Sequence, residues 1–546
     1  MQANKGTYIG NLIKTSGQSF IARLISEEDG YAPVMDVATD KVRVGQVGSY
    51  MLVKQAGTEI LTVVDKMWEE GAGHSLERMI EITPVGELKA NGNFDRGITH
   101  FPTLGAEVHL VSAWTLEKVF SEHSKSDYKI GKLSANDSID VYIDAANFFG
   151  RHVAILGQTG SGKSWTVTSL IQSALRSMPN AHIILMDLHG EYGDKKYGEI
   201  ASSPFPQDKV RCLNVQELEI PYWLLSYAEL VELFVNPDDQ HAALQISFLR
   251  SQLIRLKTEA NAALNVGHIT VDSPVYFSLD ELIGSFRNAN EQTTDFGKKK
   301  TATHGRFDQF LVRIESLVND SRYAFMFSPK KRISTDTMVG LMEDFVGLGE
   351  PKAAITVLDL SAVPFDIAPM VTAQIGRLAY EFNFWNPKCH EFPIFLICEE
   401  AHEYIPRGDH PRYKEARRSL ERISKSGRKY GVGLCIVSQR PHELSETVLA
   451  QCGTFICLRI SNPDDQDYVR ALVPDSAAGT FAALTSLARG EVIIMGDAVP
   501  MPVRLQVNRP SPPPNAQDID YSQKWKEDVE DISVKDLVSR WHSQNR

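Results

Sequence analysis

The segment Gly157-Gln158-Thr159-Gly160-Ser161-Gly162-Lys163-Ser164 limits the possible folds of this chain more than any other feature of its sequence. It fits the pattern G-x-x-x-x-G-K-[ST], follows the apolar run Val153–Leu156, and precedes apolar residues at helical spacing. Such a strand–loop–helix unit binds phosphate because glycines let backbone N–H groups turn inward and the helix N-terminus adds positive partial charge. We expect Gly157–Ser164 and the following Trp165 to contact ATP, with Lys163 on the β- and γ-phosphates and the Ser164 hydroxyl on Mg²⁺.

Two acidic residues supply the carboxylates that a phosphate-binding loop of this kind needs at the end of another strand. Glu399 and Glu400 directly follow the apolar run Ile394–Cys398. One carboxylate is expected to hold Mg²⁺ through its water shell, and the next to orient and deprotonate the attacking water. We assign Glu399 to the metal and Glu400 to the water. The alternative is a pair of exposed acids at a strand end.

Polar residues follow two further apolar runs. Asp187, His189 and Glu191 come after one strand-like segment, and Gln439 comes after another. Ligands gather at the carboxyl ends of strands in parallel α/β sheets, so Gln439 is a candidate sensor of the γ-phosphate. Asp187, His189 and Glu191 could be site residues or could form the turn, and the sequence leaves both roles open.

Strand-like runs alternate with helical patterns from Asp140 onward, which predicts an α/β fold with a parallel sheet covered by helices. The runs are His152–Leu156, His182–Met186, Ile355–Leu358, Ile394–Cys398, Gly433–Val437, Phe455–Leu458 and Val492–Met495. We divide the chain into a β module (1–125), two parts of one α/β domain (126–215 and 333–509), a helical insertion between them (216–332), and a proline linker with a tail helix (510–546).

The two ends of the chain differ from this α/β pattern. Short apolar stretches separated by turn residues predict a small barrel or sandwich at the N-terminal end, without chemistry of its own. At the other end, Pro510–Pro514 reads as a stiff linker. Beyond it, Trp525 and Trp541 belong to an apolar stripe at helical spacing. That stripe is expected to pack on the chain's own core, with a neighbouring subunit or a partner as the alternative.

Composition excludes several classes of protein. The 546 residues are 43% hydrophobic, which is enough for a sizeable core, and no stretch reaches the ~18 apolar residues of a membrane span. Since the N-terminus also lacks a signal-peptide pattern, a cytoplasmic protein without a membrane partner is expected. The six cysteines form no C-x-x-C pair, so no cysteine zinc site is indicated. A net charge of −12 argues against nucleic acid covering the whole surface, but not against a local basic channel.

Basic residues concentrate in two places. Lys414–Lys429 holds seven basic residues against two acidic ones, and Arg428 lies just before a predicted strand, as Arg151 does before the phosphate-loop strand. From that end of a strand, either arginine could reach a phosphate only in a neighbouring subunit, where it would neutralise transition-state charge. The alternative for each is a surface ion pair. A second group, Lys298–Lys300 with His304, Arg306 and Arg313, is either a solvated loop or a contact to a nucleic-acid backbone.

Several segments together resemble HerA-type ATPases of the HerA–FtsK superfamily. They are Arg151–Gly157, Asp187–Tyr192, Arg313–Leu317, Cys398–His402, Gly427–Gly431 and Ser438–Pro441. The resemblance implies a RecA-like P-loop core, with the N-terminal β module in the position of that family's HAS barrel. It also implies a homohexameric ring that hydrolyses ATP with Mg²⁺ and moves double-stranded DNA through its channel. Glu399 stands where the family usually has aspartate.

The same resemblance implies a protein partner. Family members work with a nuclease such as NurA in processing DNA ends, and bacterial relatives are paired with sirtuin-like NADases or nucleases in antiphage defence. One alternative is an assembly hub, in which nucleotide binding sets the oligomer and activates a bound effector with little translocation. Another is a translocase of protein or single-stranded DNA.

Overall fold

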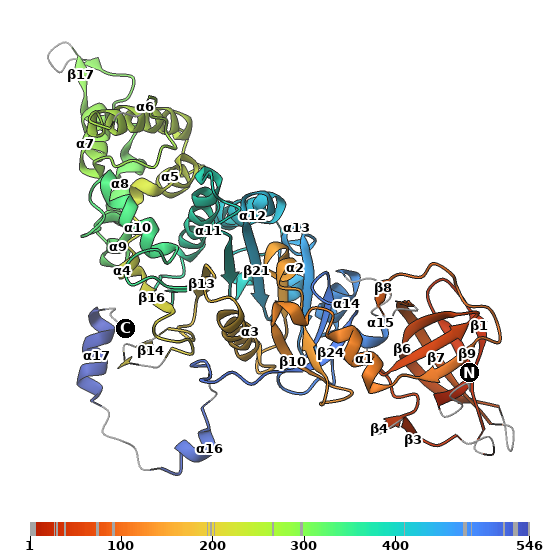
Figure 1. Cartoon of the computed structure of the whole chain (residues 1–546). Coiled ribbons are helices and arrows are strands. Elements are labelled where there is room, and N and C mark those ends of the chain that lie inside the picture. Colours follow the sequence, from red (N-terminus) through yellow and green to blue (C-terminus); the bar gives the residue numbers. More distant parts are fainter. Residues whose placement is uncertain are drawn as a thin grey trace.

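The computed structural model describes residues 7–543 apart from 27, 29–30, 38–39, 72–75, 90–92, 194, 197–198, 201–202, 265–266, 295–298, 409, 473–477, 482, 517–518 and 528–532. Figure 1 shows three parts in a row, with a β-barrel (red) at one end, an α/β domain in the middle and a group of helices (green) at the other end. None of the described helices is both long enough and apolar enough to cross a membrane.

The N-terminal module is a closed barrel, which resolves the choice between barrel and sandwich. Its strands are β1 (Tyr8–Thr15), β2 (Phe20–Leu24), β5 (Tyr50–Gln55), β6 (Thr58–Glu70), β7 (Glu77–Leu88) and β9 (Glu107–Leu110). They pair in the order β2-β1-β9-β5-β6-β7, and β7 pairs back to β2. Met51 and Val53 point into the barrel, whereas Leu52 packs toward the α/β domain. Alternate side chains of β5 therefore belong to two hydrophobic cores, one inside the barrel and one shared with the α/β domain.

The α/β domain contains one sheet of eleven strands. In spatial order these are β11 (Asp140–Tyr142), β10 (Lys129–Leu133), β24 (Val503–Val507), β23 (Glu491–Gly496), β22 (Cys452–Cys457), β12 (His152–Leu156), β21 (Val432–Ser438), β20 (Ile394–Cys398), β13 (Ile183–Asp187), β19 (Ile355–Asp359) and β16 (Val210–Asn214). The strands from β22 to β16 are parallel, and the remaining pairings are antiparallel.

One predicted strand direction is wrong. The run Val492–Met495 forms part of β23, which pairs antiparallel with β22 and not in parallel as expected. β23 is buried along nearly its whole length, as the parallel strands are. Hydropathy reports burial of both faces but carries no information on strand direction, so the sequence pattern could not distinguish the two cases.

Helices cover both faces of the sheet, and the alternation of β12 decides which side chain meets which helix. Val153 and Ile155 pack with the apolar face of α3 (Lys163–Ser177). Ala154 and Leu156 pack in the other cluster, with α11 (Ala368–Trp385) and α12 (Lys414–Ser426). This two-sided burial fixes the strand that leads into the phosphate-binding loop.

A group of helices separates β16 from β19. It consists of α4 (Val215–Leu218), α5 (Tyr227–Phe234), α6 (Ala242–Ala260), α7 (Leu279–Glu291), α8 (Asp308–Val318), α9 (Ala324–Phe327) and α10 (Met338–Phe345). Aromatic rings form much of its interior, and those of Phe286 and Phe310 stack with centroids 3.8 Å apart. The helices continue past Arg332, as far as Phe345, before the sheet resumes at β19.

The remaining elements are short. The helices are α1 (Ala113–Phe120), α2 (Ala145–Gly150), α13 (Glu446–Leu449), α14 (Pro463–Leu472), α15 (Ala478–Phe481), α16 (Tyr521–Lys524) and α17 (Val534–Ser543). The strands are β3 (Val34–Val37), β4 (Asp40–Arg43), β8 (Phe94–Arg96), β14 (Lys195–Lys196), β15 (Glu199–Ile200), β17 (Thr293–Thr294) and β18 (Lys299–Lys300).

The first part of the C-terminal segment packs on the α/β domain, and the rest extends away from it. The Gln172 side chain of α3 accepts a hydrogen bond from the backbone N–H of Ser511 (3.0 Å) and donates one to the carbonyl of Pro512 (2.9 Å). Beyond this contact, Trp525 is 82% exposed and Trp541 is 70% exposed. The expectation that these tryptophans pack on the chain's own core is therefore wrong, because a folded chain buries most of an indole ring that it uses for packing.

A buried carboxylate joins the start of the helical group to its later part. Glu219 lies just after α4, in the left-handed backbone region (φ 43°). Its side chain accepts hydrogen bonds from the backbone N–H groups of Lys330 (3.0 Å), Lys331 (2.7 Å) and Arg332 (3.1 Å). Three donors on one carboxylate make this a strong local constraint on the 330–332 segment.

Removing that carboxylate should loosen the segment it holds. We expect Glu219→Ala to lower the free energy of unfolding of the helical group by about 2–4 kcal/mol, since three partly buried N–H donors lose a charged acceptor. Amide hydrogen exchange should show lost protection at residues 330–332. Glu259→Ala is the matched control, because Glu259 is exposed and its ion pair joins it to Arg255 on its own helix. Equal protection in the two variants would contradict this role.

Candidate nucleotide site

Glycines shape the loop between β12 and α3. Gly160 and Gly162 have φ values of +75° and +104°, in the left-handed region that side chains rarely adopt. A Cβ atom at Gly157 would lie 2.7 Å from the Cβ of Leu458, which is closer than carbon atoms approach. Each of the three motif glycines is therefore needed, Gly160 and Gly162 for their backbone conformation and Gly157 for its close packing.

Hydrogen bonds attach this loop to the strands on both sides of β12. The N–H of Gly157 donates to the carbonyl of Ser438 at the end of β21 (3.2 Å), and the N–H of Gln158 donates to the carbonyl of Arg459 after β22 (3.0 Å). The Thr159 hydroxyl donates to the side-chain oxygen of Gln439. Gln439, the candidate sensor, is thus in contact with the loop.

The two acids after β20 lie at the same edge of the sheet and are both buried. β21 separates their strand from β12. The Tyr192 hydroxyl donates a hydrogen bond to the Glu399 carboxylate, and the Tyr404 hydroxyl donates to the Glu399 carbonyl oxygen (2.9 Å). Burial raises the pKa of Glu399 well above its usual value, the nearby charge of Glu191 adds to this effect, and the hydrogen bond from Tyr192 opposes it.

Glu400 has an unusual backbone conformation and an unpaired oxygen. Its φ is +44°, in the left-handed region. Its Oε2 is buried without a hydrogen-bond partner among the described residues, although Nδ1 of His402 lies 3.4 Å away. The same Nδ1 lies 3.2 Å from the Ser438 hydroxyl, so His402 links Glu400 to the end of β21.

Lys163 is buried in the field of these carboxylates. Burial lowers the pKa of its ammonium, and the charges of Glu400, Glu399 and Glu191 oppose this lowering. Lys163 and the three glutamates therefore interact electrostatically at the same edge of the sheet. Such an arrangement suits a ligand that carries its own negative charge and a divalent cation.

The residues at this edge fit a magnesium ion that arrives with a nucleotide. Mg²⁺ prefers oxygen ligands, and the Ser164 hydroxyl, the Glu399 carboxylate and the unpaired Oε2 of Glu400 are oxygen donors at the same edge. Ser164 and Glu399 would hold the ion, directly or through water. When bound, Mg²⁺ would neutralise part of the charge on the phosphates.

The turn after β13 answers a question that the sequence left open. The buried Asp187 carboxylate accepts hydrogen bonds from the backbone N–H groups of Glu191 (3.0 Å) and Tyr192 (2.9 Å), and burial raises its pKa to about 6. Asp187 therefore forms the turn, and the turn places the Tyr192 ring against Glu399. His189 is exposed.

Sequence reasoning missed Tyr192 and His402, which contact the acids, and Ser438, which contacts His402. Tyr192 and His402 lie inside segments that carried the family resemblance, and Ser438 directly precedes Gln439. Their residue types gave no signal of a role, because a buried tyrosine or histidine is more often a packed core residue than a site residue. Only the fold brings the Tyr192 hydroxyl, from the turn after β13, to a carboxylate on β20.

The two candidate arginines lie at the other edge of the sheet. Arg428 precedes β21 and Gln439 follows it, so the strand separates them by about 23 Å at ~3.3 Å per residue. Arg151 precedes β12 and forms an ion pair with Asp497. Arg428 makes no ion pair with any residue that the structure describes. Neither arginine can reach the loop of its own chain, so action on a neighbouring subunit stays a prediction.

Several residues of the two basic groups have partners within the chain. Arg422 pairs with Glu381 of α11 (2.5 Å), and Arg313 donates to the backbone carbonyls of Glu232 and Val235 at the end of α5. Arg313 therefore caps a helix, a role that the sequence did not suggest. Lys298 lies outside the described residues.

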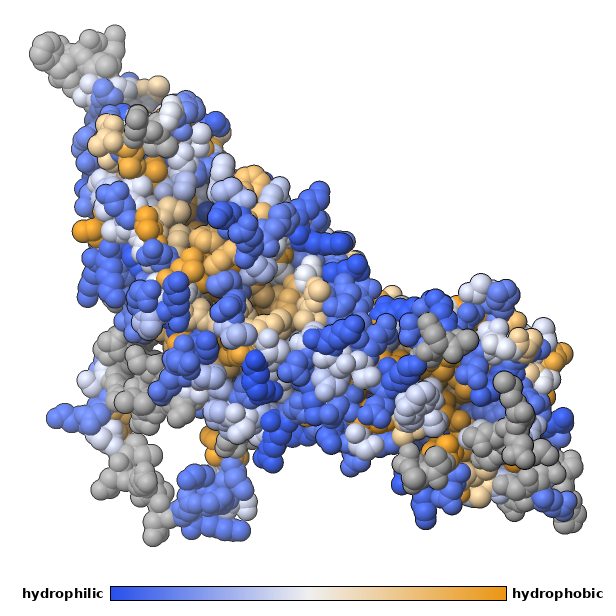
Figure 2. All heavy atoms as spheres, viewed as in Figure 1, coloured by the Kyte–Doolittle hydropathy of each residue, from blue (hydrophilic) through white to orange (hydrophobic). Residues whose placement is uncertain are grey.

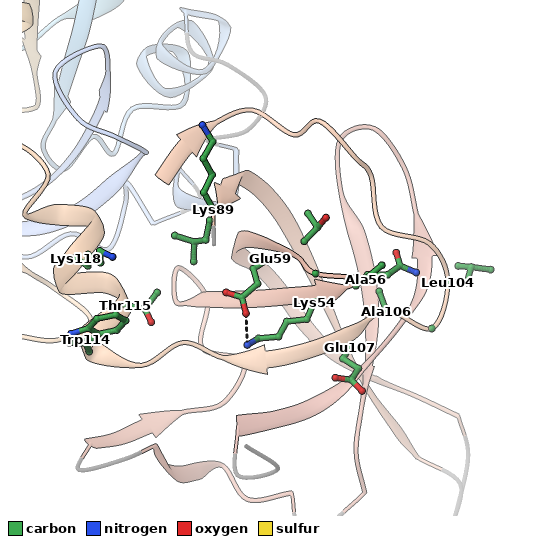
Figure 3. Close-up of a pocket in the computed structure, with 15 residues that line it drawn as sticks. Lys54, Ala56, Glu59, Lys89, Leu104, Ala106, Glu107, Trp114, Thr115 and Lys118 are labelled. Carbon is green, nitrogen blue, oxygen red and sulfur yellow. Dashed lines mark ion pairs between the residues drawn. The ribbon is translucent and has the colours of Figure 1, made fainter. Parts of the chain in front are cut away.

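A groove of about 890 Å³ lies on the barrel, away from these strand ends. Figure 3 shows Lys54 and Glu59 at this groove, on the neighbouring strands β5 and β6 and joined by an ion pair of 2.7 Å, with Trp114 and Lys118 on helix α1. The Lys118 ammonium lies 5.5 Å from the centre of the Trp114 ring. No residue of the candidate nucleotide site lines this groove.

A phosphate-binding loop between a parallel strand and a helix, opposite buried carboxylates two strands away, defines a P-loop ATPase. More particularly, the chain belongs to the HerA helicase family. Residues 128–379 match the family described as "Helicase HerA, central domain", and residues 395–527 match "Helicase HerA-like C-terminal". The family resemblance stated from the sequence is thereby confirmed.

Two named relatives agree with this assignment. The chain is 30% identical over 448 residues to "DNA double-strand break repair helicase HerA" of Sulfolobus acidocaldarius, which covers 81% of this chain and 80% of the relative. It is 28% identical over 444 residues to the protein of the same name from Sulfurisphaera tokodaii, covering 81% and 80%. Among solved structures, VirB4 of Thermoanaerobacter pseudethanolicus is similar with a TM-score of 0.45 and 16% identity, covering 70% of this chain and 96% of that one.

The contact between Tyr192 and Glu399 leads to a prediction about pH. Tyr192→Phe removes a donor that favours the ionised carboxylate, so the pKa of Glu399 should rise further. If Glu399 holds Mg²⁺ as an anion, the acid limb of the ATPase pH profile should move to higher pH, and more Mg²⁺ should be needed at neutral pH. Tyr404→Phe is the matched control, because that hydroxyl bonds the backbone oxygen of Glu399 and the Cys398 side chain, and not the Glu399 carboxylate. An acid limb at the same pH in wild type and Tyr192→Phe would disprove the coupling.

Proposed function

We propose that this chain is an ATP-driven motor that moves along double-stranded DNA as a homohexameric ring. One observation carries the proposal: the loop and the acids lie at one edge of the sheet, whereas Arg428 and Arg151 lie at the other. An arginine from that edge can complete a phosphate site only in a neighbouring copy of the chain, and a closed ring gives every copy such a neighbour.

Each site residue has a role in this proposal. Lys163 binds the β- and γ-phosphates, and Ser164 and Glu399 hold Mg²⁺. Glu400 orients the attacking water and takes its proton, and Gln439, in contact with Thr159, senses the γ-phosphate. Arg428, and Arg151 if its ion pair with Asp497 opens, neutralises charge on the phosphate of the next subunit.

The surface is compatible with assembly. Figure 2 shows apolar side chains exposed over the middle of the molecule, between the green helices and the centre of the sheet in Figure 1. Exposed large hydrophobic residues include Val312, Phe365 and Trp385. Extended apolar surface of this kind marks contact sites in many proteins, which supports contacts between copies.

Double-stranded DNA is proposed as the substrate because relatives named as DNA repair helicases match most of this chain. We propose a nuclease similar to NurA, or a sirtuin-like or nuclease effector of antiphage defence, as the protein partner. The exposed Trp525 of the tail offers an apolar ring for such a contact. If the ring were only an assembly hub, the Glu400→Gln variant would activate the partner to the same extent as the wild type does.

The motor proposal predicts that duplex DNA stimulates ATP hydrolysis and that DNA affinity falls steeply with salt. Lys163→Ala and Glu400→Gln should each lower turnover at least ~10²-fold, since one removes the phosphate contact and the other the base. Only Glu400→Gln should still retain nucleotide, which filter binding with radiolabelled ATP can measure. ATPase activity that does not respond to DNA would contradict the motor.

A mixing experiment tests the role of Arg428 in the neighbouring subunit. Arg428→Ala and Glu400→Gln rings should each be inactive, yet subunits mixed in equal amounts should place an intact Glu400 beside an intact Arg428 at about one quarter of the interfaces. Steady-state ATPase measurements should therefore recover part of the activity. The mixture of Lys163→Ala with Glu400→Gln serves as the control, because each of these variants damages the site within its own chain. No recovery in the first mixture would refute action in trans.

A further inference from the structure

His402 is a buried histidine beside the acids that has no part in the proposed function. It lies in the short turn Ala401–Glu403, directly after Glu400, and it is only 7% exposed. Burial lowers the pKa of its imidazole, and the charges of Glu400 and Glu403 do not fully offset this effect. The imidazole is therefore neutral at neutral pH, with a hydrogen on one of its two nitrogens.

Each of the two imidazole nitrogens faces a carboxylate. Nδ1 lies 3.4 Å from Oε2 of Glu400, and Nε2 lies 3.4 Å from Oε1 of Glu403. A neutral imidazole has a single N–H, so it can donate to only one of these two oxygens. The nitrogen that carries the hydrogen is determined by the hydrogen bond that the other nitrogen makes.

The Ser438 hydroxyl makes that hydrogen bond. Its oxygen lies 3.2 Å from Nδ1 and accepts a hydrogen bond from the backbone N–H of Arg440 (3.0 Å), which leaves the hydroxyl hydrogen to point at the imidazole. When Nδ1 accepts that hydrogen, the imidazole's own hydrogen lies on Nε2, toward Glu403. This placement accounts for Oε2 of Glu400, which is buried without a hydrogen-bond partner among the residues that the structure describes.

We propose that His402 is a positioning residue for ATP hydrolysis: held by Ser438, its imidazole lies against Glu400 without offering a hydrogen to Oε2. The attacking water can then donate to that oxygen. With the hydrogen on Nδ1 instead, the imidazole would bond Oε2 and compete with the water for it. This inference rests on the role of Glu400 in the proposed function, but not on DNA as the substrate or on the hexamer.

Ser438 also connects this arrangement to the phosphate-binding loop. Its carbonyl accepts a hydrogen bond from the N–H of Gly157 (3.2 Å), and the next residue, Gln439, contacts Thr159 of the loop. The end of β21 therefore contacts both the loop and His402. The placement of the imidazole hydrogen is thereby coupled to the position of the loop that binds the phosphates.

Steady-state ATPase kinetics of the full-length protein test the proposal. Ser438→Ala removes the donor and lets the hydrogen move to Nδ1, so kcat should fall about tenfold while KM for ATP stays within about threefold. Ser438→Thr keeps a hydroxyl, and its kcat should lie within about threefold of the wild type. Ser173→Ala is the matched control, because this buried hydroxyl of α3 donates to the carbonyl of Lys129 (2.9 Å) and contacts none of the acids; its kcat should be unchanged.

A double variant tests whether the two residues act together. His402→Gln loses the acceptor at the Nδ1 position and should by itself lower kcat about tenfold. Adding Ser438→Ala to His402→Gln should lower kcat by less than about twofold more, since the hydroxyl has already lost its partner. Losses that multiply in the double variant would overturn the coupling. An unchanged kcat in Ser438→Ala, or a change in KM alone, would overturn the positioning role.

The Glu400→Gln variant separates this inference from the function on which it rests. If Glu400→Gln kept wild-type turnover, the proposed role of Glu400 would itself fail. If Glu400→Gln were inactive and Ser438→Ala fully active, only the role of His402 would fail. The loss of kcat in Ser438→Ala should be the same with and without duplex DNA, because His402 and Ser438 act within one chain.

Discussion

The common direction of five neighbouring strands is the constraint on which the rest of the site depends. Because β22, β12, β21, β20 and β13 are parallel, the segments that follow them meet at one edge of the sheet. The phosphate-binding loop donates hydrogen bonds to Ser438 at the end of β21 and to Arg459 just after β22. The acids follow β20, and the turn that carries Tyr192 follows β13. The same parallel order puts the arginines that precede the strands at the opposite edge, out of reach of their own loop.

This edge concentrates buried charge, which is costly unless each group has a partner. Glu399 has Tyr192, Asp187 has the backbone of its own turn, and Lys163 has the field of three carboxylates. Glu400 is the exception, with one oxygen left unpaired among the described residues. The structure therefore leaves an unsatisfied oxygen on the residue that we propose takes the proton of the attacking water.

The sequence predicted the parts of the site that lie next to each other along the chain. The loop motif, the acids after Cys398 and Gln439 after Ser438 could be found because strand and loop are contiguous there. The direction of β23 could not be found, because buried strands look alike in hydropathy. The hydroxyl of Tyr192 on Glu399 joins residues more than 200 positions apart, and the exposure of Trp525 depends on what surrounds the tail. Such properties arise only from the folded arrangement.

The segment from Asn508 to Asn515 is attached to the α/β domain at several points, which matters for how the chain can be shortened. Its first residues, Asn508 to Pro510, line a cavity of about 550 Å³ beside the phosphate-binding loop. The Gln172 side chain binds its middle, and the N–H of Asn515 donates to the carbonyl of Glu191, in the turn that carries Tyr192. The segment 508–515 thus passes over α3, from the side of the cavity to the side of the Tyr192 turn. A truncated protein that ends before Asn508 would lose this segment together with the tail. One that ends after Asn515 would keep the segment and lose only the tail with its exposed tryptophans, so a comparison of the two would separate their effects.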